Sequence, residues 1–397
     1  MKALRSPVVF SLAALAWTGC ASPPAPPPRT LTGDPVVDGQ AMVQDAPAKD
    51  KTLWRYRTAV TAMRRGQFGV AKPLLDEALL TLGGILGPEA SAKKGRSYFA
   101  EEAKKTFIGE PYERVMAYVY RGVLYWMDGE PDNARACFRS AQLTDADTEN
   151  QAYASDYVLL DYMDGLVTRK LSGDGSDAFK RAQGLSKIAR LPDYNPKANV
   201  LFFVEFGAGP LKYATGQYGQ ELRFRRGESP VKSALIKTEG LTLPVAACDD
   251  LYFQATTRGG RVMDHILANK AVFKSATDAA GDAAILSGAI LAGSQQGRRN
   301  AGDEAGLALV LAGLASKIIS ATTTPAADTR CWDNLPQYLS FALLNLPPGP
   351  HVVTIEFLNA HGQVLANLTK TVNLTVPEPP REKVIFVSDQ SSTPQTL

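Results

Sequence analysis

Histidine and cysteine are scarce in this chain of 397 residues, which contains three histidines and four cysteines. His265, His351 and His361 are not arranged as His-x-x-x-His, and no Cys-x-x-Cys pair occurs. A zinc site needs three or four converging nitrogen, sulfur or oxygen ligands. The sequence therefore predicts no metal site.

The motifs of nucleotide-binding and hydrolytic enzymes are also missing. There is no Gly-x-x-x-x-Gly-Lys-Ser/Thr loop and no Gly-x-Ser-x-Gly elbow. Ser-x-x-Lys occurs at Ser91 and Ser229, without the Ser-Asp-Asn and Lys-Thr-Gly motifs that accompany it in penicillin-binding enzymes. Asp264 adjoins His265, but adjacent residues on a strand point to opposite faces. We expect no catalytic residues and no cofactor, and we predict that the chain is not an enzyme.

Strong net charge and long apolar runs are absent as well. The formal net charge is +3, and no basic stripe interleaved with aromatic residues argues for a nucleic-acid partner. The apolar stretch from Pro7 to Trp17 is about half of the roughly 20 residues that a spanning helix needs. Since 45% of the residues are hydrophobic, the chain can build a core, and its length suggests two domains.

The first twenty residues have the layout of an export signal. Lys2 and Arg5 precede the apolar stretch, and Thr18-Gly19-Cys20 ends it. This ending resembles the lipobox of bacterial lipoproteins, although Trp17 stands where an aliphatic residue is expected. The resemblance implies a lipoprotein signal peptide over residues 1–19 and a lipid on Cys20. The alternative is ordinary secretion, with cleavage after Ala16 and a free thiol at Cys20.

A proline-rich segment follows Cys20, because five of residues 23–28 are proline. Proline at this density favours extended polyproline II. We predict a tether over residues 20–50. Ala21 and Ser22 lack the aspartate that retains many lipoproteins at the inner membrane, so we expect the chain at the periplasmic side of the outer membrane of a two-membrane bacterium.

Residues 51–192 are predicted to form a helical domain, because their apolar residues recur at helical spacing. Two segments in this region share one pattern, in which a glycine is followed at fixed intervals by small and large apolar residues. The first copy has Gly66, Phe68, Ala71, Leu75 and Ala78, and the second has Gly129, Pro131, Ala134, Phe138 and Ala141.

This spacing is similar to that of the tetratricopeptide repeat. Tyr118, Gly122 and Tyr125 match the first helix of such a unit, and a degenerate third unit spans Tyr157 to Ala182. The resemblance implies a curved array whose concave groove binds peptides or proteins. The alternative is a generic helical bundle whose alanines and glycines fall at these positions by chance.

Residues 193–397 are predicted to form an α+β domain that ends in a small antiparallel β-sandwich or sheet. Strands are expected at 200–206, 221–225, 251–257, 351–358, 364–368, 371–376 and 383–387. An Ala/Gly/Leu-rich stretch at 281–320 has two apolar halves, each too short to span a bilayer. We interpret it as a helical hairpin packed on the sheet. The alternative is a membrane-touching or self-associating hairpin, because Gly288 and Ala292 allow close helix contact.

Three cysteines remain if Cys20 carries a lipid. An oxidising periplasm permits one disulfide, and Cys248–Cys331 is the pair we would test. Cys137 lies in a helical pattern and is expected to be a small core residue.

The segment Asp328-Thr329-Arg330, followed by Trp332 and Leu335-Pro336, is distinctive. Together with the lipobox, the helical repeats and the Ala/Gly-rich stretch, it resembles a family of uncharacterised proteobacterial envelope lipoproteins. Members of that family are often encoded beside lipoproteins that activate peptidoglycan synthases, which implies envelope biology. Cys331 stands where the family pattern has a small polar residue.

These features favour a lipid-anchored periplasmic scaffold or adaptor that binds an envelope protein partner through its helical groove. The alternative is an enzyme, or an enzyme accessory, that acts on peptidoglycan or exported polysaccharide. Self-association through residues 283–319 is a third hypothesis.

Overall fold

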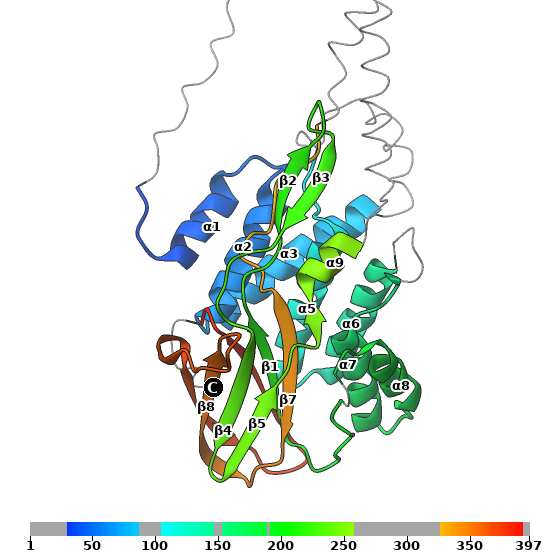
Figure 1. Ribbon diagram of the computed structural model, residues 1–397, viewed down its shortest axis with the longest axis vertical. Helices are drawn as coiled ribbons and strands as arrows, with labels where there is room; N and C mark the ends of the chain where they lie inside the picture. The colour runs from blue at the N-terminus through cyan, green and yellow to red at the C-terminus, as the bar shows by residue number, and fades with distance from the viewer. Residues whose placement is uncertain (1–29, 87–104, 147–152, 189–190, 258–325, 392–397) are drawn as a thin grey trace, which may run out of the picture.

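The computed structural model describes residues 30–86, 105–146, 153–188, 191–257 and 326–391. These residues form a mixed α+β fold in which most helices precede the strands along the chain (Figure 1). The helices are α1 (Pro35–Asp45), α2 (Lys51–Arg64), α3 (Phe68–Leu86), α5 (Pro111–Met127), α6 (Pro131–Asp145), α7 (Val158–Lys170), α8 (Ser176–Leu185), α9 (Leu251–Thr257) and the short 3-10 helix η3 (Ala366–Leu368).

The strands form two four-stranded sheets and one separate hairpin. They are β1 (Val200–Phe206), β2 (Leu211–Thr215), β3 (Glu221–Arg225), β4 (Ser233–Thr238), β5 (Leu241–Val245), β6 (Asp249–Asp250), β7 (Tyr338–Leu344), β8 (Gly349–Leu358), β9 (Lys370–Val376) and β10 (Lys383–Ser388). The first sheet has the order β10-β1-β7-β6, the second has the order β5-β4-β8-β9, and β2 and β3 form a two-stranded sheet. We call the two large sheets the central sheet and the outer sheet.

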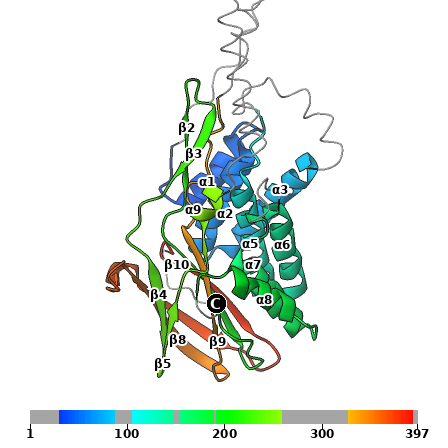
Figure 2. The same ribbon diagram turned by 45° about the vertical axis from the view of Figure 1, so that its right-hand side comes forward.

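The layers lie helix on sheet on sheet, with the central sheet in the middle (Figure 2). Strand β1 of the central sheet is covered on both faces, because all seven of its residues are buried. Leu201 and Phe203 pack in the core shared with the helices, whereas Phe202 and Phe206 pack in the core shared with the outer sheet. A strand buried on both faces reads as a continuous apolar run rather than as an alternating one. The predicted helical and α+β regions therefore share a hydrophobic core.

The helices before the sheets pack mainly against their neighbours in sequence, as successive antiparallel hairpins. Gly66 closes the α2–α3 hairpin and Gly129 closes the α5–α6 hairpin. Their φ angles are 70° and 79°, a conformation that glycine adopts without strain. In each hairpin the second helix buries the predicted small-large-small stripe: Ala71, Leu75 and Ala78 on α3, and Ala134, Phe138 and Ala141 on α6. The predicted third unit is also a helical hairpin, formed by α7 and α8.

The contact between α5 and α6 depends on Gly122. A Cβ atom at this position would lie 2.7 Å from Cε1 of Phe138. We expect Gly122→Ala to lower the free energy of unfolding by about 1–2 kcal/mol, because overpacking outweighs the higher helix propensity of alanine. Urea unfolding followed by circular dichroism measures this change.

Gly69→Ala is the matched control, because a Cβ atom on Gly69 meets nothing within 4 Å. This change should stabilise α3 by about 0.5 kcal/mol. Equal losses in the two variants would contradict the close packing of α5 on α6.

Several of the predicted strands are confirmed, namely those at 200–206, 221–225, 351–358, 371–376 and 383–387. Two are wrong. Residues 251–257 form helix α9, because the side chain of Asp250 accepts a hydrogen bond from the Tyr252 amide (2.9 Å) and so caps a helical turn. At 364–368 only Val364 forms a bridge, to Leu358, before the chain turns into η3.

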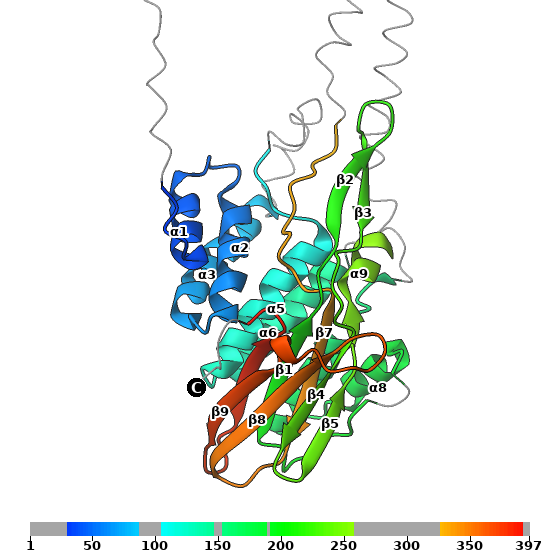
Figure 3. The ribbon, with the colours of Figure 1, turned by 60° about the vertical axis from the view of Figure 1, so that its left-hand side comes forward.

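The final strand also differs from the predicted antiparallel ending. Strands β8 and β9 are antiparallel, but β10 leaves the outer sheet and pairs in parallel with β1. The edge of the central sheet is thus completed by residues 383–388, far from β1 in sequence. Figure 3 shows the outer sheet in front of the molecule, with β9 at one edge and β5 at the other.

The predicted tether of residues 20–50 is too long, because its second half contains α1. Asp34 caps this helix by accepting hydrogen bonds from the amides of Val36 and Val37, and Pro35 occupies its first turn. Val36 is buried, and α1 packs on α2. The predicted signal peptide, Cys20 and the Ala/Gly-rich stretch at 281–320 lie outside the described residues.

In the part of the chain that the structure describes, every helix is too short or too polar to cross a bilayer.

Candidate functional site

The carboxyl ends of β1 and β10 bring two buried carboxylates together. Because these strands are parallel, Glu205 of β1 lies beside Ser388 of β10, and the Asp389 amide donates a hydrogen bond to the Glu205 carbonyl (3.3 Å). The ends of parallel strands are a common location for ligand sites. We call Arg64, Tyr120, Glu205 and Asp389 the strand-end cluster.

Helices α2 and α5 provide the partners of Glu205. Arg64, at the end of α2, donates from Nε to Glu205 Oε1 (2.7 Å), and its Nη2 lies 2.6 Å from the same oxygen. Tyr120 of α5 donates its hydroxyl proton to Oε2 (2.5 Å). All three side chains are buried. Burial disfavours the charged guanidinium, but the Glu205 carboxylate overcomes this effect and raises the pKa of Arg64.

Asp389 is the less compensated carboxylate of the cluster. Its Oδ2 atom accepts a hydrogen bond from the Gly207 amide (3.0 Å), which favours the charged form. Burial, strengthened by the negative charge of Glu205, nevertheless raises the pKa of Asp389 to about 6. The folded protein therefore holds a proton here at mildly acidic pH.

This proton makes stability depend on pH. In the unfolded chain Asp389 has its ordinary pKa, near 4, so the stabilisation is complete below about pH 4 and is lost as the pH rises through about 6. Asp389→Asn stays neutral throughout. We expect the free energy of unfolding of this variant to rise relative to the parent by on the order of 2 kcal/mol between pH 4 and pH 7.

Urea unfolding at both pH values measures the difference, with the exposed Asp177→Asn as a control. A difference between Asp389→Asn and the parent that is the same at pH 4 and pH 7 would contradict the buried titration.

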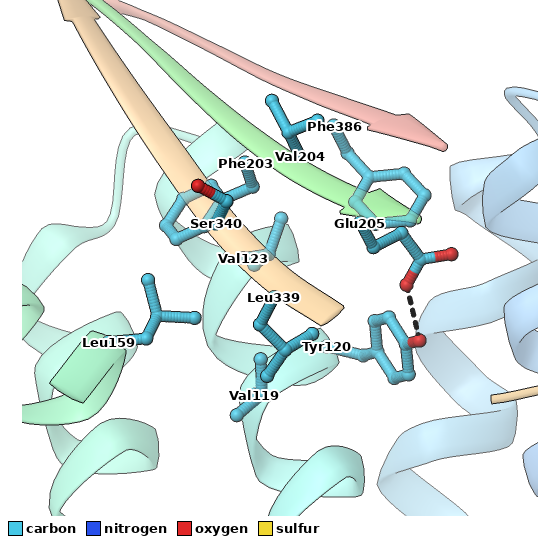
Figure 4. A pocket seen from close by; sticks show the side chains of 10 residues that line it. All are labelled: Val119, Tyr120, Val123, Leu159, Phe203, Val204, Glu205, Leu339, Ser340 and Phe386. Carbon is cyan, nitrogen blue, oxygen red and sulfur yellow. Dashed lines mark hydrogen bonds between the residues drawn. The ribbon is translucent and has the colours of Figure 1, made fainter. Parts of the chain in front are cut away.

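The hollow beside the cluster is small and mostly apolar. Its volume is about 20 Å³, and Val123, Leu159, Phe203 and Leu339 are among the residues that line it. Figure 4 shows the Glu205 carboxylate turned toward the Tyr120 hydroxyl, with Ser340 and apolar side chains around the rest of the hollow. A space of this size holds about one water molecule. Such a hollow is much smaller than a sugar or a peptide, and the cluster beside it joins α2 and α5 to the central sheet.

The distinctive segment at 328–336, which we call the strap, lies across α2 and α5. Trp332 is fully buried and stacks on Tyr56 of α2, with ring centroids 4.2 Å apart, and its amide donates to Glu113 Oε1 of α5 (2.7 Å). Asn334 donates to the Arg57 carbonyl of α2 (3.0 Å). Arg330 forms ion pairs with Asp50 and with Asp328 inside the strap, both at 2.7 Å.

A second buried ion pair fixes the β2–β3 hairpin to the helices. Lys212 of β2 donates to Glu113 Oε2 of α5 (2.5 Å) and to the Arg330 carbonyl of the strap (3.0 Å). Burial opposes the positive charge of Lys212, but the charge of Glu113 reverses the effect and raises the pKa. Glu113 therefore connects a helix, the strap and the hairpin.

The adjacent carboxylates Asp249 and Asp250 point to opposite faces, as expected of strand neighbours. Asp249 is buried and accepts hydrogen bonds from the amides of Val158 and Leu159, at the start of α7 (2.8 and 2.9 Å). Burial raises its pKa to about 7. Asp250 instead pairs with Arg226 (3.3 Å). Asp249 is therefore a helix-capping residue, and Asp264 and His265 lie outside the described residues.

The predicted disulfide between Cys248 and Cys331 is not formed in the structure. Both residues, and Cys137 of α6, are free thiols. Their sulfur atoms have different neighbours, because Cys248 lies 3.8 Å from the Ser340 hydroxyl and Cys331 lies 3.6 Å from the Pro210 carbonyl. Burial raises the pKa of Cys331 to about 11 and that of Cys248 to about 12, so both thiols stay protonated and unreactive near neutral pH.

The sequence contained one signal of the strand-end cluster. Glu205 is the only charged residue in the otherwise apolar run of β1, and a buried charge requires a partner. Nothing local identifies Arg64, which lies 141 residues earlier, or Asp389. Among the described residues, no group of three or more His, Cys, Asp or Glu side chains is placed to bind a metal ion.

Comparison with known proteins gave no match: no protein-family model, no curated protein and no solved structure is significantly similar to this chain.

Proposed function

We propose that this chain is a lipid-anchored scaffold or adaptor at the periplasmic side of the outer membrane, where its tetratricopeptide-like helical array binds an envelope protein. The export signal and the Thr-Gly-Cys20 ending support the membrane address. The α2–α3 and α5–α6 hairpins, each with a buried small-large-small stripe, support the repeat assignment.

The contacts of the array favour its outer side as the partner surface. The inner helices α2, α5 and α7 pack against the central sheet through α2–β10, α5–β10 and α7–β7 contacts. Trp332 of the strap lies against α2 and α5. The groove that would hold a peptide in a free repeat array is therefore filled by the chain itself.

The observation that carries the proposal is a pair of exposed leucines. Leu80 on α3 and Leu143 on α6 each follow the turn glycine of their hairpin by fourteen residues, and each is 76% exposed. A single exposed leucine needs no explanation. Two at equivalent positions of adjacent repeats indicate that the outer helices share one apolar contact.

The test is site-specific photo-crosslinking in intact cells. A photoreactive residue at position 80 and one at position 143 should capture the same envelope protein. Position 352 on the outer sheet is the matched control, because Val352 is also an exposed apolar residue (58%). Capture of different proteins at 80 and 143, or of the same protein at 352, would contradict the assignment.

The anchor has a separate test. Mass spectrometry of the mature N-terminus should find a diacylglyceryl-modified Cys20. A mature chain that begins at an unmodified Trp17 would remove the membrane address, while the crosslinking result would still report on the adaptor role.

A further inference from the structure

The β2–β3 hairpin belongs to neither large sheet. Among the described residues it projects past α1 and α2, at the end opposite the β4–β5 turn (Figures 1 and 3). A two-stranded ribbon is barely stable alone in water. This ribbon is held by its inner face: Lys212 forms the buried ion pair with Glu113, Leu222 packs against Ala327, and Phe224 meets Tyr112 edge to face.

The outer face of the hairpin carries aromatic, apolar and basic side chains. The strand register places Tyr213 opposite Arg223 and Leu211 opposite Arg225. Tyr213 is 42% exposed, the Arg223 side chain is 58% exposed, and Arg225 is exposed as well. Leu211 is half-buried, whereas Tyr213, Arg223 and Arg225 are exposed to solvent.

The exposed charges of the outer face are mainly positive. This face carries Arg223, Arg225 and Glu221, a net charge of 2 − 1 = +1. Lys212 does not add to it, because it is buried with Glu113, and Arg226 pairs with Asp250. Glu221 pairs with Arg223 at 2.7 Å, but both side chains are largely in water. An exposed pair of this kind is weak and is readily exchanged for another anion.

The size of the face decides which kind of anionic partner fits. Two paired strands of five residues each cover roughly 17 Å by 10 Å, or less than about 200 Å². A specific protein interface needs about 800 Å² on each partner. A few arginines beside tyrosine and leucine are instead sufficient to add to membrane binding, because each basic residue near an anionic leaflet contributes independently. Tyrosine is itself favoured at the membrane–water interface.

We propose that the outer face of the β2–β3 hairpin binds the anionic headgroups of a phospholipid surface. This inference rests on the proposed membrane address, since a lipid anchor would bring the hairpin near the bilayer. One lipid chain alone binds a membrane weakly and reversibly, and a basic patch supplies the second attachment. Arg223 and Arg225 contact the phosphates, and Tyr213 inserts at the headgroup level.

The test is flotation of the full chain, carrying Cys20→Ala to remove the anchor, with vesicles of known composition. The protein should bind vesicles of equal parts phosphatidylglycerol and phosphatidylcholine, and not vesicles of phosphatidylcholine alone. Arg223→Gln with Arg225→Gln should weaken binding about 30-fold, because two cationic contacts are lost. Tyr213→Ala should weaken it further.

Lys180→Gln with Lys197→Gln is the matched control, because it removes the same charge from two exposed residues outside the hairpin. This control should bind as the parent does. Absence of parental binding, equal losses in the two double variants, or binding to soluble heparin but not to the vesicles would each overturn the proposal. None of these outcomes affects the crosslinking or the N-terminal mass, so the adaptor and the anchor are judged separately.

Discussion

Arg64→Met should lower the free energy of unfolding by about 3–5 kcal/mol, because it leaves the buried Glu205 carboxylate without its cation. Methionine keeps most of the volume of the arginine side chain, so the loss reports on charge rather than on a cavity. Tyr120 still donates one hydrogen bond to Glu205, but a neutral donor does not balance a full charge in a buried site. Urea unfolding measures the loss.

A double variant separates this effect from general damage. Arg64→Met combined with Glu205→Gln removes both charges and keeps an acceptor for the Tyr120 hydroxyl. We expect this variant to recover most of the stability that the single variant loses. If the double variant were as unstable as the sum of the two single variants, the ion pair would not be what couples α2 to β1.

Trp332→Ala should cost about 3–5 kcal/mol, the range for removal of a fully buried large aromatic side chain. The change empties the space between Tyr56 of α2 and Tyr120 of α5, so it affects the helices as well as the strap. The urea midpoints of unfolding measured by circular dichroism and by the fluorescence of the remaining tryptophans should both shift to lower urea concentration, by the same amount.

Trp54→Ala is the control for this prediction, because Trp54 is also on α2 but is only partly buried. Its loss should be clearly smaller. A Trp332→Ala variant with parental stability would mean that the strap rests on the helices without holding them to the sheet.

Local pattern predicted the parts of the fold that depend on neighbours in sequence. The stripe of Ala134, Phe138 and Ala141 indicated a closely packed helical hairpin, because residues three and four apart lie on the same face of a helix. The continuous apolar run at 200–206 and the alternating apolar residues at 371–376 indicated strands, because strand patterns also lie within a few residues. The prediction of a strand at 251–257 was wrong. The β-forming side chains of this segment did not indicate that Asp250 would cap a helical turn.

The candidate site was harder to predict, because its members come from distant segments. Glu205 stood out as a charge in an apolar strand, but Arg64 and Asp389 have no local feature that marks them as its neighbours. The strap was recognised as distinctive, yet the contact of Trp332 with Tyr56 depends on a fold that joins residues far apart in sequence. Which side chains meet between two layers depends on the topology of the whole fold, and a short stretch of sequence does not reveal that topology.

The position of β10 beside β1 also sets the order of events while the chain is made. Residues 383–391 leave the ribosome long after α2, α5 and β1. Until then β1 lacks its parallel neighbour β10, and Glu205 lacks its contact with Asp389. Contacts of such long range make folding slow. The β1–β10 edge of the central sheet therefore cannot form until residues 383–388 have left the ribosome.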